Sequence, residues 1–228
     1  MTEVAAPNAT FEPLARRLGS ILGSDIGIAC SAIHAGTDCL YPDEFSAVRN
    51  AVTKRQREFA TGRANARLAM TRIGERCVSI PMLADRAPAW PVHLVGSISH
   101  THAACAAVVG RKKNVRSIGI DLERDRPMEE ALWPSIWTTA EEAHVRAQPI
   151  EWQGHLMIRL FSAKEAVYKW QYPQTHRMLE FNQVEVTWLG DGPEARFVAQ
   201  VKGAGKLGPV QGQCLVHEDL VVSLVCMR

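Results

Sequence analysis

The sequence of 228 residues predicts an α+β protein. Two segments have the apolar periodicity of helices, one ending at Gly74 and one running from about Glu151 until shortly before Pro173. Around them lie short apolar runs bounded by turn residues, which are typical of strands. Helices are thus interleaved with mainly antiparallel strands, and this order of elements indicates the α+β class.

The elements of the first half follow from local signals. Leu14, Leu18 and Leu22 mark a short amphipathic helix that Gly23 ends, and residues 26–33 have the composition of a strand. Proline and acidic residues in "YPDEF" open the next helical region. We expect this region to continue without a break through "KRQREFATGRANARLAMTRIG".

The middle of the chain has the pattern of consecutive strands. Two prolines keep residues 86–93 extended or turned, and residues 94–100, 103–109 and 115–123 then read as strands. The turn "GRKKN" separates the last two of these strands, so we expect them to form a hairpin. A midpoint between two halves is expected near residues 110–118.

The second half begins with a helix start signal. Thr138 and Glu141 have the spacing of a capping box. In the following long helix, Leu160, Val167 and Trp170 recur at helical spacing and form part of a core stripe. The chain closes with strand-like runs at "FNQVEVTW", "ARFVAQV" and "QCLVHEDLVVSLVC".

Composition indicates an ordinary soluble protein of the cytoplasm. The formal charge of +2 gives no bulk electrostatic attraction to nucleic acid. No stretch approaches the ~20 consecutive apolar residues of a membrane span, and the first residues lack the pattern of a leader. The six cysteines are scattered without C-x-x-C or zinc-ligand spacing, which favours a reducing compartment.

Two carboxylates interrupt an apolar strand in "SIGIDLERDRP". Asp121 and Glu123 share one face of this strand with Gly119, which we expect to leave open space. Like charges at this spacing repel, and Mg²⁺ commonly binds a few carboxylates together with substrate phosphates. A solvated strand face is the alternative, and the local sequence leaves both open.

The long helix carries a second polar group. Ser162, Glu165 and Lys169 fall on a face that differs from the core stripe. They can form an ordinary surface pair, or they can supply a third carboxylate near a metal and a lysine that reaches a phosphate.

Two further segments can bind an anion. In "GSISHTH", Ser99 and His100 end a strand, although adjacent strand residues point to opposite faces and no G-x-S-x-G motif supports a hydrolase. In "RQREFATGRANAR", Arg55 and Arg63 carry guanidinium groups suited to phosphate. We expect Gly62, beside Arg63, to allow the close approach of a bulky anion. A hydrogen-bonded histidine and an exposed helix face are the alternatives.

Four ordered motifs, "KRQREFATGRANAR", "WPVHLVGSISHT", "IGIDLE" and "FSAKEAVYKW", resemble those of the 4′-phosphopantetheinyl transferases. The likeness is closest to the stand-alone surfactin-type group and its enterobactin synthase component D-like members. It implies a pseudo-twofold pair of similar α/β subdomains with coenzyme A across the seam. Residues 1–114 would form an N-terminal subdomain that contacts the nucleotide, and residues 115–228 a C-terminal subdomain with the metal and catalytic acids. His93 departs from the family's glycine without removing a reacting group.

The resemblance also implies roles for individual residues. Asp121 and Glu123, with the carbonyl of Leu122, correspond to the Mg²⁺ ligands. Glu165 corresponds to an acid beside the metal that acts as general base, directly or through water, and the pattern leaves open whether it also binds the metal. Lys169 corresponds to the lysine that meets the coenzyme A pyrophosphate. The implied catalytic residues are Glu165, Lys169 and Asp121. The implied coenzyme A contacts are Arg55, Arg63, Arg86, Ser99, His100, Asp121, Glu165 and Lys169.

The implied reaction moves the 4′-phosphopantetheine moiety of coenzyme A to a serine of an apo acyl, peptidyl or aryl carrier protein. It is Mg²⁺-dependent and releases adenosine 3′,5′-bisphosphate. A monomer serving siderophore, non-ribosomal peptide or polyketide synthesis is expected. Two alternatives stay open: a Mg²⁺-dependent nuclease or phosphodiesterase, and a non-catalytic coenzyme A-binding module. The near-neutral charge argues against the first, and we expect no nucleic acid partner and no membrane insertion.

Overall fold

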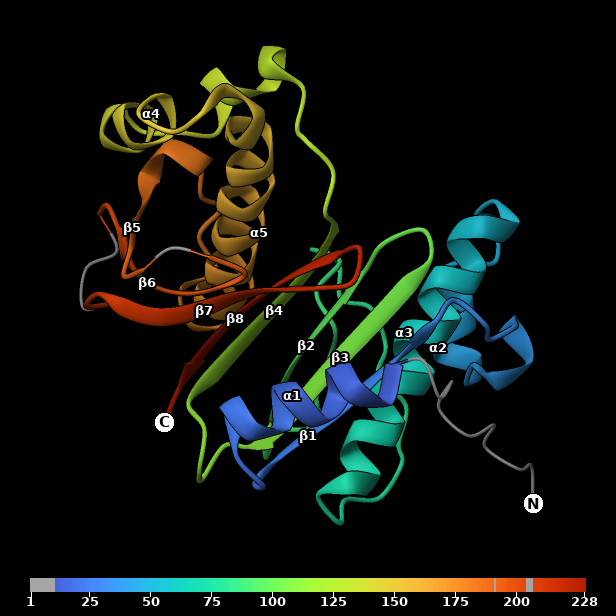
Figure 1. Cartoon of the computed structure of the whole chain (residues 1–228). Coiled ribbons are helices and arrows are strands. Elements are labelled where there is room, and N and C mark those ends of the chain that lie inside the picture. Colours follow the sequence, from blue (N-terminus) through green and yellow to red (C-terminus); the bar gives the residue numbers. More distant parts are fainter. Residues whose placement is uncertain (1–10, 191, 204–206) are drawn as a thin grey trace. The chain divides into compact units, whose positions relative to one another are not determined.

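The computed structural model describes residues 11–190, 192–203 and 207–228. The chain divides into two compact units, Met1–Arg116 and Ser117–Arg228, and each contains an antiparallel sheet covered by one long helix (Figure 1). The expected α+β class is therefore confirmed. Among the described helices, none is both long enough and apolar enough to cross a lipid bilayer. The first ten residues, which bear on the expectation about a leader, lie outside the described part of the chain.

The first unit is a three-stranded sheet between two helices, with strand order β1-β3-β2. A Cβ at Gly27 would lie 1.9 Å from the carbonyl oxygen of Ala69, so this face of β1 packs on α3. The next residue, Ile28, lies near Gly19 of α1, so α1 covers the opposite face. The elements of this unit are α1 (Glu12–Leu22), β1 (Ile26–Ala32), η2 (Thr37–Cys39), α2 (Pro42–Ser46), α3 (Thr53–Arg72), β2 (Leu94–His100) and β3 (Ala104–Arg111).

The second unit is a five-stranded antiparallel sheet with strand order β4-β8-β7-β6-β5. Helix α5 packs on β4 and β8 and buries the predicted stripe, including Leu160, Val167 and Trp170 (Figure 1). The elements of this unit are β4 (Ser117–Arg124), η3 (Glu130–Ser135), α4 (Thr139–Arg146), α5 (Ile150–Thr175), η4 (Phe181–Gln183), β5 (Val184–Trp188), β6 (Glu194–Val201), β7 (Val210–His217) and β8 (Leu220–Met227).

The helical region expected to continue unbroken to Gly74 is interrupted. Helix α2 ends at Ser46, and α3 begins at Thr53 after Val52, whose backbone is extended. The break has a long-range cause, because the fully buried Glu44 of α2 pairs with Arg67 of α3 at 2.8 Å. This contact requires the chain to fold back between the two helices rather than to continue in line.

The expected hairpin between the strands on either side of "GRKKN" is wrong. Strand β3 pairs with β1 on one side and with β2 on the other, so both its edges are used. Strand β4 instead pairs with β8, at the far end of the sequence. The hairpin that does form is β2–β3, in which Ser99 lies opposite Ala106.

The predicted capping box is confirmed at the start of α4. The backbone N–H of Thr138 donates to the Glu141 carboxylate at 2.6 Å, and the backbone N–H of Glu141 donates to the Thr138 hydroxyl at 3.4 Å. Helix α5 runs past its expected end and includes Pro173. In the last turn of a helix, a proline removes only one backbone hydrogen bond, so the helix continues until His176 adopts a left-handed conformation.

Gly119 is the point at which α5 touches β4. A Cβ at Gly119 would lie 2.0 Å from the carbonyl oxygen of Ala166 and 2.7 Å from the backbone nitrogen of Trp170. The expectation of open space here is therefore wrong, since the helix backbone fills it. The same close approach sets α5 over the face of β4 that carries Asp121 and Glu123.

This contact predicts that Gly119→Ala destabilises the protein by about 3 kcal/mol, because the added methyl group meets backbone atoms that cannot move aside. Gly208→Ala is the matched control, since a Cβ there meets nothing within 4 Å. We expect the control to change the free energy of unfolding by less than about 0.5 kcal/mol. Urea denaturation of both variants measures the difference, and equal stabilities would contradict the contact.

Candidate active site

Strand β4 and helix α5 bring four of the predicted residues together. Asp121 and Glu123 leave β4 on the same face, and Glu165 and Lys169 lie one turn apart on α5. The ammonium group of Lys169 donates to Asp121 Oδ1 at 2.6 Å. Residues 48 positions apart in the sequence therefore meet in one polar cluster, which we call the acid cluster: Asp121, Glu123, Glu165 and Lys169.

The acid cluster has more negative than positive groups. The pKa of Glu123 is raised to about 7, first by burial and then by Asp121 and Glu165, while Lys169 opposes the rise. Burial also raises the pKa of Glu165, against the effect of Lys169. Glu123 and Glu165 therefore retain their protons more readily than free carboxyl groups do, which is the behaviour of a site that favours an additional cation.

The register of β4 directs the Leu122 carbonyl away from the partner strand β8. The N–H of Asp125 donates to the carbonyl of Asp219 at 2.7 Å, in continuation of the β4–β8 pairing. Hydrogen-bonded pairs alternate along an antiparallel ladder, so Asp121 and Glu123 turn their backbone groups toward β8. Leu122 therefore directs its carbonyl to the other edge of β4. Strand β4 is the outermost strand on that side of the five-stranded sheet.

The donor set fits a hard divalent cation. Within the described residues, no three His, Cys, Asp or Glu side chains stand close enough together to hold a metal as they are placed. Lys169 instead binds Asp121. Carboxylate and carbonyl oxygens are the ligands that Mg²⁺ takes, and the pKa of Glu123 is raised by burial and by the neighbouring carboxylates Asp121 and Glu165. The residues present therefore fit Mg²⁺.

A pocket of about 210 Å³ adjoins the acid cluster and is lined by Glu165. Its other walls come from Lys164 and Tyr168 of α5 and from residues 178–181 and 184. The Tyr168 hydroxyl donates to the sulfur of Met178 at 2.9 Å across this wall. One carboxylate of the cluster thus faces a cavity with largely apolar sides.

The first unit holds a basic group built on α3 and β2. Arg55 Nη1 lies 2.9 Å from His100 Nε2, and Glu58 lies within 3.9 Å of both side chains. The predicted pair of Arg55 and His100 is thus brought together. Glu58 was not predicted, although its position three residues after Arg55 is the spacing of a helix-surface pair.

Arg63 is buried rather than exposed. It retains 5% of its accessible surface, donates from Nε to the carbonyl of Ile80 at 2.6 Å, and covers the ring of Phe59. Its pKa is lowered to about 10, first by burial and then by Arg67 and Arg55, while Glu44 opposes the change. An anion beside this guanidinium would stabilise its charge.

Gly62 does not provide the expected opening for an anion next to Arg63. A Cβ at Gly62 would meet the Ile98 side chain of β2 at 3.1 Å. The expectation is wrong because the missing side chain allows β2 to pack closely on α3.

The other two predicted coenzyme contacts in the first unit differ in burial. Arg86 is exposed in a loop, with φ 70° and its N–H bonded to the carbonyl of Leu83. Ser99 is buried and, as the neighbour of His100 in β2, points to the opposite face of the sheet.

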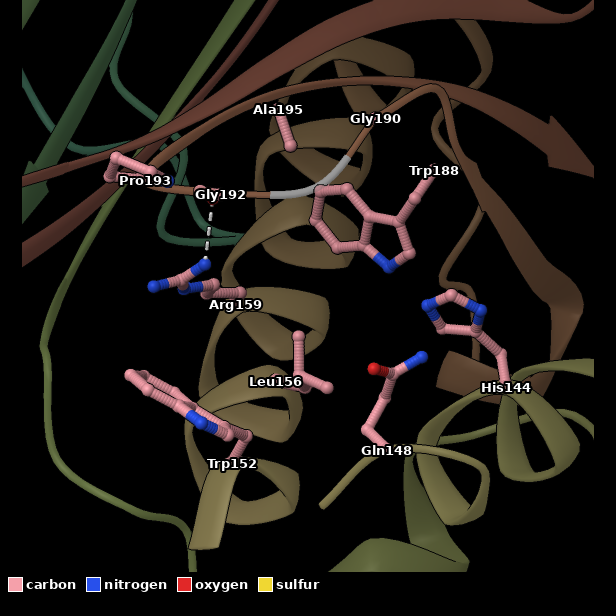
Figure 2. Close-up of a pocket in the computed structure, with 10 residues that line it drawn as sticks. All are labelled: His144, Gln148, Trp152, Leu156, Arg159, Trp188, Gly190, Gly192, Pro193 and Ala195. Atoms are coloured by element: carbon pink, nitrogen blue, oxygen red, sulfur yellow. Dashed lines mark hydrogen bonds between the residues drawn. The ribbon is translucent and has the colours of Figure 1, made fainter.

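A larger cavity, of about 350 Å³, contains none of the predicted residues (Figure 2). Trp152, Leu156 and Trp188 form apolar walls, and Arg159 donates to the carbonyl of Gly192 at 2.9 Å. The acid cluster lies elsewhere in this unit, between β4 and α5. The larger of the two cavities is therefore not the one beside it.

The crowded carboxylates predict a pH-dependent stability in metal-free buffer. The folded state raises the Glu123 pKa from about 4.5 to about 7, so it binds this proton more tightly than the unfolded state. The associated stability is fully present below pH 4.5 and is lost as the pH rises through 7. Glu123→Gln removes this loss. After allowance for solvent screening, we expect a gain of about 1 kcal/mol at pH 8 and almost none at pH 4.5.

Thermal unfolding with chelator at the two pH values measures this effect. Glu129→Gln, at an exposed acid before η3, is the control. A gain for Glu123→Gln that is equal at both pH values would contradict the electrostatic origin.

Comparisons with known proteins agree with this arrangement. Family models match on both units: "4'-phosphopantetheinyl transferase N-terminal domain" over residues 43–110 and "4'-phosphopantetheinyl transferase superfamily" over residues 117–224. The transferase Svp of Streptomyces mobaraensis is 34% identical over 219 residues, covering 85% of this chain and 84% of its own. The transferase PptT of Mycobacterium tuberculosis is 34% identical over 197 residues, covering 82% and 85%.

A third relative carries a different name. Enterobactin synthase component D of Salmonella typhimurium is 35% identical over 155 residues, covering 67% of this chain and 63% of its own. Both units therefore match the family predicted from the four motifs. The chain belongs to the 4′-phosphopantetheinyl transferase superfamily and is an enzyme of that class.

Proposed function

We propose that this transferase moves the 4′-phosphopantetheine arm of coenzyme A to a serine hydroxyl of an apo carrier protein, with Mg²⁺ bound at the acid cluster. Adenosine 3′,5′-bisphosphate is the product released. The main support for placing the reaction at the acid cluster is that Asp121, Glu123 and Glu165 lie around Lys169. The family membership supports the reaction class.

Asp121 and Glu123 would hold the ion, together with the edge carbonyl of Leu122. When bound, Mg²⁺ supplies positive charge to the coenzyme pyrophosphate and offsets the charge that develops on the departing phosphate. Lys169 already binds Asp121 at 2.6 Å, so it is placed to donate to the same phosphate oxygens.

Glu165 is the proposed general base. Its raised pKa makes it a stronger proton acceptor than an ordinary carboxylate, which suits removal of the serine proton directly or through one water. The pocket lined by Glu165 is the proposed seat of the pantetheine arm, since its walls are largely apolar and the arm is uncharged.

The basic residues of the first unit are proposed to hold the nucleotide end of coenzyme A. Burial first, and then the positive charges of Arg67 and Arg55, lower the pKa of Arg63. A phosphate beside this guanidinium would stabilise its charge, which supports a phosphate site there. His100 adds a ring nitrogen at 2.9 Å from Arg55. Ser99 and Arg86 are proposed as further contacts on the resemblance alone.

The partners we propose are acyl, peptidyl or aryl carrier proteins. The relative named enterobactin synthase component D supports service in siderophore assembly, and we extend this to non-ribosomal peptide and polyketide synthesis. We propose a monomeric protein without a nucleic acid partner. The cysteines form no disulfide within the described residues, and Cys30, Cys105 and Cys214 are buried. This supports a reducing compartment such as the cytoplasm.

Intact-mass analysis of an apo carrier incubated with the protein, coenzyme A and Mg²⁺ tests the reaction. The expected result is the mass gain of one phosphopantetheine group.

Asp121→Ala should lower the rate at least about a hundredfold and leave the fold intact, because it removes a metal ligand and relieves carboxylate repulsion. Asp219→Ala, at an exposed acid in the turn before β8, is the control. An unchanged transfer rate in Asp121→Ala would contradict the assignment of Asp121 as a metal ligand. If the wild-type protein binds coenzyme A but the carrier gains no mass, the protein is a non-catalytic module.

Substitution of two arginines tests the nucleotide contacts. Arg55→Ala should raise the KM for coenzyme A roughly tenfold at saturating carrier, with little change in kcat or Tm, since Arg55 is partly exposed. Arg63→Ala should raise the same KM and also lower Tm, because it removes the bond to Ile80 and the contact with Phe59. An unchanged KM for coenzyme A in both variants would remove these residues from the binding site.

A further inference from the structure

Lys164, the residue before Glu165, is a buried cation outside the acid cluster. It is 1% exposed, and its ammonium group donates to three acceptors. These are the Glu141 carboxylate at 2.7 Å, the carbonyl of Ile136 at 2.7 Å and the carbonyl of Phe181 at 2.9 Å. An ammonium group has three N–H donors, so none remains for a substrate.

Glu141 is held as firmly as its partner. It is 4% exposed and, besides Lys164, accepts from the N–H of Thr138 at 2.6 Å and from the N–H of Val186 at 2.7 Å. The pair therefore joins α5 to the start of α4, to the chain before it, to η4 and to β5. Such a fully satisfied buried pair fixes the geometry of the elements that it joins.

The pair also belongs to the wall of the pocket beside Glu165. Lys164 and Phe181 both line this pocket, and the bond between them ties the 178–181 segment to α5. The rings of Phe161 and Phe181, with centroids 5.3 Å apart, reinforce the same contact. The spacing between Glu165 and the opposite wall is therefore set by a bond that Lys164 makes.

We propose that Lys164 is a positioning residue: together with Glu141 it holds the 178–181 segment at the distance from Glu165 that admits the arm of coenzyme A. This role rests on the proposed function, in which the arm occupies the pocket and Glu165 is the base. Lys164 acts through the pocket wall and not through contact of its ammonium group with a phosphate, in contrast to Lys169.

Two ligands distinguish this role from a general effect on folding. Coenzyme A contains the arm, and adenosine 3′,5′-bisphosphate contains only the nucleotide end. In Lys164→Met, we expect calorimetry to show a loss of affinity for coenzyme A of about tenfold, with unchanged affinity for the bisphosphate. The KM for coenzyme A should rise in parallel in the transfer assay.

A second variant covers the case in which Lys164→Met does not fold. Glu141→Gln with Lys164→Met removes both charges, leaves no unpaired buried ion, and keeps an amide oxygen at position 141 to accept from a backbone N–H. It still frees the Phe181 carbonyl, so it should show the same selective loss. Lys202→Met, at a neighbouring lysine with an exposed side chain, is the matched control and should bind both ligands as the wild type does.

Equal losses for both ligands, or unchanged binding of coenzyme A in the double variant, would overturn the positioning role. The proposed function fails separately. Wild-type protein that binds coenzyme A without transferring its arm, or Glu165→Gln that transfers at the wild-type rate, contradicts the assigned chemistry. Neither result alters the comparison of the two ligands in the Lys164 variants.

Discussion

The backbone contact between β4 and α5 is the constraint on which the acid cluster depends. A side chain at Gly119 would collide with the carbonyl of Ala166, so the helix can lie this close only over a glycine. The close approach brings Lys169 within 2.6 Å of Asp121 and sets Glu165 beside Glu123. Carboxylates that are distant in sequence are thereby confined to a region of low exposure, where burial first and neighbouring carboxylates second raise the pKa values of Glu123 and Glu165. The packing of the core and the electrostatics of the site have one cause.

The two units have opposite imbalances of charge around their buried ionisable groups. In the second unit, carboxylates outnumber the one ammonium group among them, and the pKa of Glu123 rises to about 7. In the first unit, Arg63 is buried near Arg55 and Arg67, and its pKa falls to about 10. Each imbalance is relieved by a ligand of the other sign.

Sequence reasoning recovered what depends on neighbouring residues. The stripe of Leu160, Val167 and Trp170 and the capping box of Thr138 and Glu141 follow from spacing within one element, and both are present. The acids of the site were found because two carboxylates in an apolar strand require an explanation, and the family likeness then gave them roles.

Contacts between distant segments could not be predicted in this way. Strand β4 pairs with β8, roughly a hundred residues later, rather than with the strand before it. The burial of Arg63 depends on Ile80, and that of Lys164 on Glu141 and Phe181. The spaces beside Gly62 and Gly119 are filled by Ile98 and by the backbone of α5. A glycine indicates that something comes close, but its neighbours in sequence do not identify what that is.

Helix α5 carries Lys164, Glu165 and Lys169 on one continuous rod of 26 residues. Each residue of an α-helix turns the chain by about 100°, so an insertion or deletion of one residue between Glu165 and Lys169 would rotate one of these groups away from the other. Changes of length in the connections at either end leave this geometry untouched. The connections at the two ends of α5 can therefore differ in length while the spacing inside the helix stays fixed.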